Sequence, residues 1–375
     1  MEIGEIRTEL DQVDKEICSL FEKRMQLCEE VARTKILSGK PVLDRTREQQ
    51  KLDAVAKEAS NELNARGLRE LYSQIMCLSR KLQYTKLMES GVIRESAFIP
   101  VDNLKSDKMR VVFQGTNGAY SQLAGVTYFG DDVEAYPVDT FRDAMCAIEE
   151  GRADYAVLPI ENSTAGVVDE MYDLLVEFEN HIVGEQIIGI EHALLGCKDS
   201  ELSDIRTVYS HPQALMQCQG YLREHADFKQ VSYLNTAMAA KKVFDDQDKS
   251  QAAIANPYTA ELYGLKILQK KINDEKENST RFIIVAGKKI YCKNASKISL
   301  CFEIPHAAGS LYQTLSHLIY NGLNMTKIES RPVRERNWEY RFFVDFEGNL
   351  SDVRVKNALA GLRAETTYLK ILGNY

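Results

Sequence analysis

The first 88 residues repeat apolar side chains at spacings of three and four, and Pro41 is the only proline among them. Such a period places the apolar side chains on one face of an α-helix, so this block is predicted to be almost purely helical. The expected helices cover residues 3–37, 44–64 and 67–88. Phe21 and Met25 lie off the main apolar stripe, and three helices alone cannot cover every apolar face. We therefore expect the block to dimerise.

Charge and composition restrict the kinds of protein that this chain can be. Its 375 residues carry a formal net charge of −8, which argues against a nucleic-acid coat or a protein that binds anionic membranes. No apolar run approaches the roughly 18 residues of a membrane span, and the charged first residues lack the apolar core of a secretion signal. The eight cysteines include no Cys-x-x-Cys pair, so neither a zinc site nor a disulfide framework is indicated. A cytoplasmic protein is expected.

The middle of the chain, residues 109–288, alternates short apolar segments with amphipathic ones, which predicts an α/β sheet. The expected strands cover residues 109–114, 154–159, 207–209, 252–255 and 282–285. The expected helices cover residues 120–129, 140–150, 212–225 and 236–244. The length suits two small lobes with a cleft between them. Residues 89–108 show no period and are expected to form a linker.

The last block, residues 296–375, predicts a separate and smaller domain. Its segments are expected in the order strand, helix, strand, strand, helix, strand, which is the order of a ferredoxin-like α+β domain. They cover residues 297–302, 309–320, 325–331, 339–346, 352–364 and 368–372. A small unit of this kind after a block of enzyme size is more often regulatory than catalytic.

Polar side chains interrupt the apolar stripes of the helical block. Arg24 stands where the first helix otherwise holds core residues, and Lys35 lies on the same face. Ser79 and Gln83 enter the inner face of the third helix, and Glu48 shares a stripe with apolar residues of the second. Buried cations need anionic partners, so the pattern fits either an internal ion-pair network or a pocket for a small anion with several carboxylates. Catalysis in such a pocket would depend on electrostatics and positioning, since no nucleophile with an orienting base is visible.

This pattern resembles the all-helical chorismate mutases. The matching positions are Arg7, Arg24, Lys35, Asp44, Arg47, Glu48, Ser79 and Gln83. The resemblance implies the Claisen rearrangement of chorismate to prephenate in an entwined dimer, with Arg7 reaching in from the partner chain. It also implies that Arg24, Lys35 and Arg47 hold the two carboxylates and the ether oxygen of the substrate. The remaining implied roles are Gln83 at the ether oxygen, Asp44 and Glu48 on the hydroxyl side, and Ser79 at a carboxylate.

Four strand ends of the middle block carry polar side chains that suggest a cleft. The segment from Gly115 to Ser121 follows a strand and opens a helix, so its N–H groups offer an anion cradle, although a plain tight turn fits as well. The other three ends carry Asn162 and Ser163, then Ser210 with Gln217 one helical turn on, then Thr280 and Arg281. Each residue alone is an ordinary cap or turn residue, and His211 is expected to be a turn residue. The block lacks a dinucleotide glycine fingerprint, a Ser-His-Asp order and a Walker lysine.

These motifs together resemble prephenate dehydratase. The matching segments are GxxGxYS, PIEN before Ser163, YSHPQA, LYGL and NxTRF. The resemblance implies loss of water and carbon dioxide from prephenate to give phenylpyruvate, without a cofactor. It implies Thr280 as a donor to the departing oxygen or a proton relay, and Arg281 as a carboxylate anchor. The expected substrate-binding residues are Ser121, Asn162, Ser163, Ser210, Gln217 and Arg281. Gln122 and Asn256 depart from the pattern, which more often has His and Ser there.

The C-terminal block resembles an ACT regulatory domain through Gly309-Ser310-Leu311 and Glu329-Ser330-Arg331-Pro332. The resemblance implies domains that pair side by side and bind an amino acid at the joint. Phenylalanine is then the expected allosteric inhibitor, with Gly309, Leu311, Glu329 and Ser330 at its site. A ferredoxin-like module that only dimerises is the alternative.

Along its whole length the chain resembles the bifunctional chorismate mutase/prephenate dehydratases of phenylalanine biosynthesis. The expected partners are chorismate and prephenate as substrates and phenylalanine as inhibitor, in a homodimer or higher homo-oligomer without cofactor or metal. A mutase fused to prephenate dehydrogenase would need a nucleotide, and the missing glycine fingerprint counts against it. A mutase fused to a non-catalytic amino-acid-sensing module is the other alternative.

Overall fold

The chain divides into two compact units. The computed structural model describes residues 2–91, 97–104, 108–275, 277–333, 336 and 338–375. One unit holds Met1–Ala97 and Ser296–Ile371, and the other holds Phe98–Ala295 and Leu372–Tyr375. Within the described residues, no helix is both long enough and apolar enough to cross a membrane.

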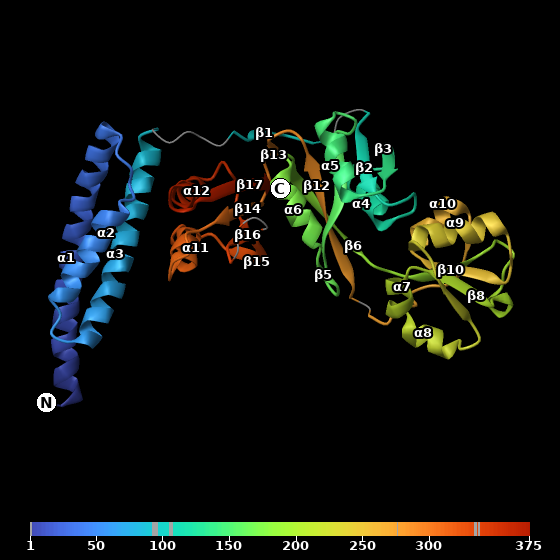
Figure 1. Cartoon of the computed structure of the whole chain (residues 1–375), viewed down its shortest axis with the longest axis horizontal. Helices are drawn as coiled ribbons and strands as arrows, with labels where there is room; N and C mark the ends of the chain where they lie inside the picture. Colours follow the sequence, from blue (N-terminus) through green and yellow to red (C-terminus); the bar gives the residue numbers. More distant parts are fainter. Residues whose placement is uncertain (1, 92–96, 105–107, 276, 334–335, 337) are drawn as a thin grey trace. The chain divides into compact units, whose positions relative to one another are not determined.

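Three long helices form the N-terminal block, as predicted (Figure 1). They are α1 (Ile3–Ser38), α2 (Arg45–Lys57) and α3 (Glu62–Glu89). Gly39 ends α1 in the left-handed conformation that glycine adopts without strain. The prediction that the second helix runs to residue 64 is wrong, because the side chain of Asn61 accepts from the Asn64 N–H and caps the start of α3.

The apolar stripe of α1 is uncovered in a single chain. Its large side chains keep between 42% and 71% of their surface exposed. They are Ile3, Ile6, Leu10, Val13, Ile17, Leu20, Leu27 and Val31. An exposed apolar row of this size is typical of an interaction surface.

The second unit begins with a lobe built on a mixed sheet. The strands are β2 (Arg110–Gln114), β3 (Glu134–Val138), β4 (Tyr155–Asn162), β6 (His181–Gly189) and β12 (Ser279–Ala286), in the order β6-β12-β4-β2-β3. A short strand β5 (Gly166–Val167) pairs with β4. The helices are α4 (Tyr120–Phe129), α5 (Phe141–Glu149) and α6 (Asp169–Glu177). Val111, Phe113, Val157 and Ile284 lie in a core that also contains Ala124 and Phe129 of α4.

One strand falls inside the predicted linker. β1 (Ile99–Val101) pairs in parallel with β13 (Ile290–Cys292), so this part of the linker belongs to the second unit. Residues 92–96 and 105–107 of the predicted linker lie outside the described residues.

The chain leaves the first lobe after β6, builds a second lobe, and returns at β12. The second sheet has the order β11-β7-β10-β8-β9. Its strands are β7 (Ala193–Gly196), β8 (Thr207–Ser210), β9 (Lys229–Ser232), β10 (Gln251–Ala255) and β11 (Lys266–Gln269). Its helices are α7 (Pro212–Gln217), α8 (Gln219–Glu224), α9 (Thr236–Asp246) and α10 (Pro257–Tyr263), with a 3-10 turn at Leu202–Asp204. The single helix predicted over 212–225 is interrupted at Cys218, which has non-helical backbone angles.

The C-terminal block contains the predicted order of strands and helices. Its elements are β14 (Lys297–Glu303), α11 (Ser310–Tyr320), β15 (Met325–Pro332), β16 (Tyr340–Glu347), α12 (Val353–Glu365) and β17 (Tyr368–Asn374). The strand order is β15-β16-β14-β17, and β16 is antiparallel to both of its neighbours. β15 therefore lies at one edge of this sheet, where its outer N–H and C=O groups can pair with another strand.

Candidate functional site

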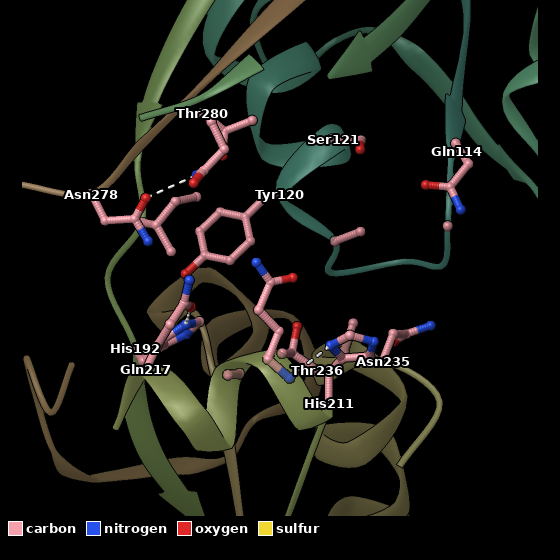
Figure 2. A pocket seen from close by; sticks show the side chains of 17 residues that line it. Gln114, Tyr120, Ser121, His192, His211, Gln217, Asn235, Thr236, Asn278 and Thr280 are labelled. Atoms are coloured by element: carbon pink, nitrogen blue, oxygen red, sulfur yellow. Dashed lines mark hydrogen bonds between the residues drawn. The ribbon is translucent and has the colours of Figure 1, made fainter. Parts of the chain in front are cut away.

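A cavity of about 350 Å³ lies between the two lobes of the second unit (Figure 2). Its walls come from the loop before α4, the end of β4, the start of β12, and the starts of α7 and α9. Its lining residues include Gln114, Tyr120, Ser121, Asn162, His192, His211, Gln217, Asn235, Thr236, Asn278 and Thr280. Among the described residues, no group of three or more His, Cys, Asp or Glu side chains could hold a metal ion.

Thr280 and Asn162 face each other across the paired strands β12 and β4. Asn162 Nδ2 donates to Thr280 Oγ1 over 2.9 Å, and it also contacts Asn278 Oδ1 at 2.8 Å. Asn162 Oδ1 accepts from the backbone N–H groups of Thr164 and Ala165, at 3.0 and 2.8 Å. Those two backbone donors fix which end of the amide carries the nitrogen. Asn162 thus donates to the Thr280 oxygen, and the hydroxyl hydrogen of Thr280 is left to donate elsewhere.

A buried histidine holds Gln217 at the opposite wall of the cavity. His192 Nε2 lies 2.9 Å from Gln217 Oε1, and since an amide oxygen can only accept, the two form a hydrogen bond in the tautomer that carries the proton on Nε2. Burial lowers the pKa of His192, although the hydrogen bond with Gln217 opposes this, and the ring is neutral at pH 7. Tyr120, beside the His192 ring, donates its hydroxyl to the Glu191 carbonyl over 2.7 Å. These contacts present the NH₂ end of Gln217 as the available donor.

Gln122 and Asn256, the two residues that depart from the dehydratase pattern, both form hydrogen bonds with the loop before α4. Gln122 Oε1 accepts from the Gly118 N–H at 2.6 Å. The Gly118 carbonyl accepts from Asn256 Nδ2 at 2.8 Å and from Thr259 Oγ1 at 2.9 Å, both of them buried residues of the other lobe. Gly118 has φ +91, and a Cβ there would lie 3.1 Å from the Thr259 methyl group, so this close approach needs glycine.

Three predicted substrate-binding residues do not line this cavity. Ser163 Oγ accepts from the Ser279 N–H at 2.9 Å and so ties β12 to the turn after β4. Ser210 is fully buried and donates to the Ile254 carbonyl over 2.6 Å.

The third is Arg281, which lies between two carboxylates and not at the cavity. Its guanidinium is 3.4 Å from both Glu161 and Glu185. Side chains alternate along a strand, so the residue after Thr280 faces the other side of the sheet. The expectation that Arg281 anchors a substrate carboxylate is not supported by its position.

Sequence reasoning missed several lining residues. Asn235 caps α9 through the Met238 N–H at 2.7 Å, and Thr236 begins that helix at the cavity wall. An Asn before an apolar helix is a readable signal for a helix start, but it does not reveal that the start faces a cleft. His211 caps α7, as a turn residue does, and it also lines the cavity.

The helical block brings two of its predicted residues into contact. Arg24 Nη1 donates to Ser79 Oγ over 2.5 Å, and Cys28 Sγ lies 3.3 Å from the same oxygen. Lys35 donates to the Val42 carbonyl over 2.6 Å. Burial lowers the pKa of Lys35, while the nearby carboxylates of Asp44 and Glu48 oppose this shift. Arg24, Ser79, Lys35, Asp44 and Glu48 therefore belong to one polar region at the inner faces of the helices.

The remaining predicted mutase residues lie around this region or far from it. Asp44 caps α2 by accepting from the Arg47 N–H at 2.9 Å, and the Arg47 side chain is exposed. Gln83 is buried, and its Oε1 has no hydrogen-bond partner among the described residues. Arg7 is exposed and lies about 25 Å along α1 from Arg24, at 1.5 Å per residue. Arg7 cannot reach the polar region of its own chain.

The C-terminal block has a cavity of about 420 Å³ beside the start of α11. Gly309, at φ +79, and Leu311 line it together with Trp338, Tyr340 and Phe342. Glu329 and Ser330 do not line it and lie on the edge strand β15. The structure thus brings together two of the four residues predicted at an effector site.

Comparison with known proteins follows the same division of the chain. The family described as chorismate mutase type II matches residues 6–84, and the prephenate dehydratase family matches residues 111–290. The bifunctional chorismate mutase/prephenate dehydratase of Aquifex aeolicus is 32% identical over 380 residues, which cover 100% of this chain and 98% of that protein.

The chain belongs to the bifunctional chorismate mutase/prephenate dehydratase family. A solved prephenate dehydratase of Arthrobacter aurescens, in complex with L-Phe, is 31% identical and has a TM-score of 0.64. The matched region covers 71% of this chain and 89% of the Arthrobacter aurescens chain. A solved quorum-quenching acylase, GqqA, is 34% identical and has a TM-score of 0.65. The matched region covers 71% of this chain and 96% of the GqqA chain. Members of this fold can therefore carry different activities.

The Thr280 hydroxyl lines the cavity, and Asn162 leaves its hydrogen available to donate. Thr280→Val keeps the shape of the side chain and removes the donor, so kcat for prephenate dehydration should fall at least about 100-fold. Thr280→Ser restores the hydroxyl and should stay within about tenfold of the original enzyme. The measurement is phenylpyruvate formation from prephenate, with the thermal midpoint recorded for both variants. A Val variant within about threefold of the original would remove Thr280 from the mechanism.

Proposed function

We propose that the chain performs two successive reactions in separate domains. Residues 1–88 convert chorismate to prephenate, and residues 109–288 convert prephenate to phenylpyruvate, with residues 89–108 as the linker. The assignment of the dehydratase reaction to residues 109–288 rests on the Thr280 hydroxyl, which faces the cavity while Asn162 donates to its oxygen. The product of the first domain is the substrate of the second, so one chain provides both steps.

The mutase reaction needs a folded substrate and positive charge, and no covalent chemistry from the protein. As the C–O bond of chorismate breaks, negative charge grows on the ether oxygen, and cations near that oxygen stabilise the transition state. Lys35 and Gln83 are proposed at this oxygen, with Arg24, Arg47 and Ser79 at the two carboxylates. Nε2 of the buried Gln83 donates to the Ser79 carbonyl in the structure, so in this proposal the amide turns to bring Nε2 to the ether oxygen.

The dehydratase reaction breaks two bonds of prephenate and makes the ring aromatic. The ring hydroxyl leaves with the electron pair of its C–O bond and takes up a proton to become water. The ring carboxylate leaves as carbon dioxide, and the electron pair of its C–C bond enters the ring. Thr280 is proposed to donate to the departing oxygen. Asn162 supports this role, because a hydroxyl that accepts one hydrogen bond becomes a stronger donor in the next.

Neutral donors are proposed to hold the carboxylates of prephenate. No Lys or Arg is among the described residues that line the cavity. The available donors are the backbone N–H groups at the starts of α4 and α9 and the Gln217 amide, and N–H groups at a helix start favour an anion. The proposed contacts are Ser121, Gln217 and Thr236.

Two copies of the chain are proposed to share each mutase site. The exposed apolar stripe of α1 supports a dimer in which this face is buried. The distance between Arg7 and Arg24 along one straight helix supports the same arrangement, because Arg7 can then complete the polar region of its partner. The homodimer is the smallest assembly that satisfies both observations.

The C-terminal block is proposed to be a ferredoxin-like ACT domain that binds phenylalanine. The cavity beside Gly309 and Leu311 has apolar walls that suit an aromatic ring, and the start of α11 offers N–H groups for a carboxylate. The L-Phe complex of the related dehydratase supports this choice of ligand. Glu329 and Ser330 are proposed to act across a pair of such domains, since their strand is free to pair at its edge.

Conversion of chorismate to phenylpyruvate by the purified chain, without added nucleotide, tests the proposed function as a whole. Phenylpyruvate should accumulate after prephenate, because the two reactions are successive. Hydroxyphenylpyruvate formed only with added nucleotide would favour a dehydrogenase. Prephenate that accumulates without any phenylpyruvate would favour a mutase fused to a sensor.

Mixed dimers test the shared mutase site. Arg7→Ala and Arg24→Ala chains should each show under about 1% of the original mutase activity, since each removes a cation from every site. In a dimer of one chain of each kind, one site keeps both arginines. Co-expression of the two variants should therefore recover about one quarter of the original activity, because half of randomly paired dimers are mixed. Dehydratase activity is the control and should not change; a mixture as inactive as its parents would exclude a site shared in this way.

Substitution at Gly309 tests the effector site. Gly309→Val places a branched side chain in the cavity and at a φ of +79, which disfavours residues with a Cβ. Dehydratase activity without phenylalanine should stay within about twofold, because the substitution lies outside the catalytic cavity. Inhibition by phenylalanine should weaken at least about tenfold, as measured by the concentration that halves the rate. Unchanged potency would show that the effector binds elsewhere.

A further inference from the structure

Four titratable side chains meet within the first unit where α3 contacts α11 and α12. These are Glu48 of α2, Arg80 of α3, His317 of α11 and Glu365 of α12, which we call the interface ion cluster. Arg80 is 4% exposed, Glu365 is 7% exposed and His317 is 1% exposed. The cluster therefore joins the helical block to the C-terminal block through buried charges.

The guanidinium of Arg80 is divided between two carboxylates. Its Nη1 donates to both oxygens of Glu48 at 2.7 Å, and its Nε donates to Glu365 Oε1 at 2.6 Å. His317 Nε2 lies 3.2 Å from the same Glu365 oxygen, and Arg45 donates to the Glu365 backbone carbonyl over 3.3 Å. Because the guanidinium is a rigid fork, the bond at Nε sets the direction in which Nη1 points.

Arg80 and Glu365 favour each other's charged forms. Burial opposes the charge of Arg80, but the carboxylates of Glu365 and Glu48 outweigh it and raise its pKa. Burial alone would raise the pKa of Glu365, but His317 and Arg80 together lower it. Removal of either partner from a buried pair leaves a charge without compensation, so the remaining side chains must move or take up a proton.

Glu48 is also close to the proposed mutase site. Arg80 binds both of its oxygens, and its negative charge also acts on the ammonium group of Lys35. Loss of Glu365 would free the Nε end of Arg80 to turn toward Glu48. The Glu48 carboxylate would then lose the fixed direction that its contact with Arg80 gives it.

We infer that Arg80 and Glu365 are positioning residues for the chorismate mutase reaction, with Glu365 supplied by the C-terminal domain. They act through Glu48 and do not touch the substrate. The C-terminal block is thus part of the mutase in addition to any regulatory role. This inference rests on the proposed role of Glu48 in the mutase site.

The same interface offers contacts that do not involve Glu48. Gln313 Nε2 of α11 donates to Ser73 Oγ of α3 over 3.3 Å. Lys81 Nζ lies over the Tyr320 ring, 5.1 Å from its centre. Attachment of the two blocks therefore does not depend on the ion cluster alone, and a variant at Gln313 is a matched control for the interface.

The central test is Glu365→Gln in the full chain, which keeps the shape of the side chain and removes its charge. We expect kcat of the mutase to fall about tenfold while KM changes less than about twofold, because Glu48 is misdirected without loss of the carboxylate-binding cations. Dehydratase activity should not change. Gln313→Ala, as the control, should leave both activities unchanged. A mutase kcat of Glu365→Gln equal to that of the original enzyme would overturn the inference.

A double-mutant cycle separates positioning from general stability. If Glu365 acts through Arg80, then Glu365→Gln should have no further effect on mutase kcat in an Arg80→Met background. The paired variant Arg80→Met/Glu365→Met removes both charges together and is expected to fold even where a single change does not. Its mutase kcat should match that of Arg80→Met. Independent, multiplicative effects of the two changes, or an equal loss of dehydratase activity, would overturn the inference.

A third variant distinguishes failure of this inference from failure of the proposed mutase site. Glu48→Gln should lower mutase activity at least as much as Glu365→Gln does. If Glu48→Gln keeps the original mutase activity, the proposed role of Glu48 is wrong, and the inference falls with it. If Glu48→Gln is impaired and Glu365→Gln is not, the site stands and only the positioning role is wrong.

Discussion

The hydrogen bond from Asn162 to Thr280 depends on the pairing of β4 with β12, and the whole second lobe lies between these two strands in the sequence. The chain leaves the first lobe after β6 and builds the whole second lobe before it returns as β12. Thr280 therefore reaches its place only when the second lobe is complete. The same return places Asn278 beside Asn162, and it brings Gln217 and the start of α9 to the other side of the cavity. The cavity is therefore complete only when both lobes are folded.

The fold alone does not determine the reaction, because a solved acylase shares it at a TM-score of 0.65. The assignment rests on the chemistry of the cavity. A hydroxyl with its hydrogen available, neutral amides and helix starts suit a substrate that must lose hydroxide and a carboxylate. The helical block is proposed to work by a different means, in which its cations and carboxylates stabilise charge and hold the substrate in one conformation. Neutral hydrogen-bond donors are thus proposed to predominate in the dehydratase site, and charged groups in the mutase site.

Local patterns in the sequence predicted the elements well where the apolar period continues along a whole helix or strand. The three helices of the first block follow from their period, and the C-terminal order of strands and helices was also predicted. The second helix was predicted too long because the Asn61 cap competes with a periodic pattern that continues through it. Thr280, Asn162, Ser121 and Gln217 were predicted at one site, and the structure places them around one cavity.

Contacts that depend on direction or on distant residues could not be predicted. Arg281 follows Thr280 in the sequence, yet strand alternation turns it toward Glu161 and Glu185. The bond of Arg80 to Glu365 spans 285 positions, and in the sequence each residue is an ordinary charge on an amphipathic helix. Only the packing of α3 against α12 shows that these charges are buried and paired.

Product analysis of the Thr280→Val chain supplied with chorismate tests the central claim, that two separate sites act in succession, most directly. Every chorismate consumed should appear as prephenate, at the rate at which the original enzyme consumes chorismate, and phenylpyruvate should be absent or trace. Phenylpyruvate formed at the original rate would contradict the assignment of the second site. Loss of chorismate consumption would contradict the independence of the first.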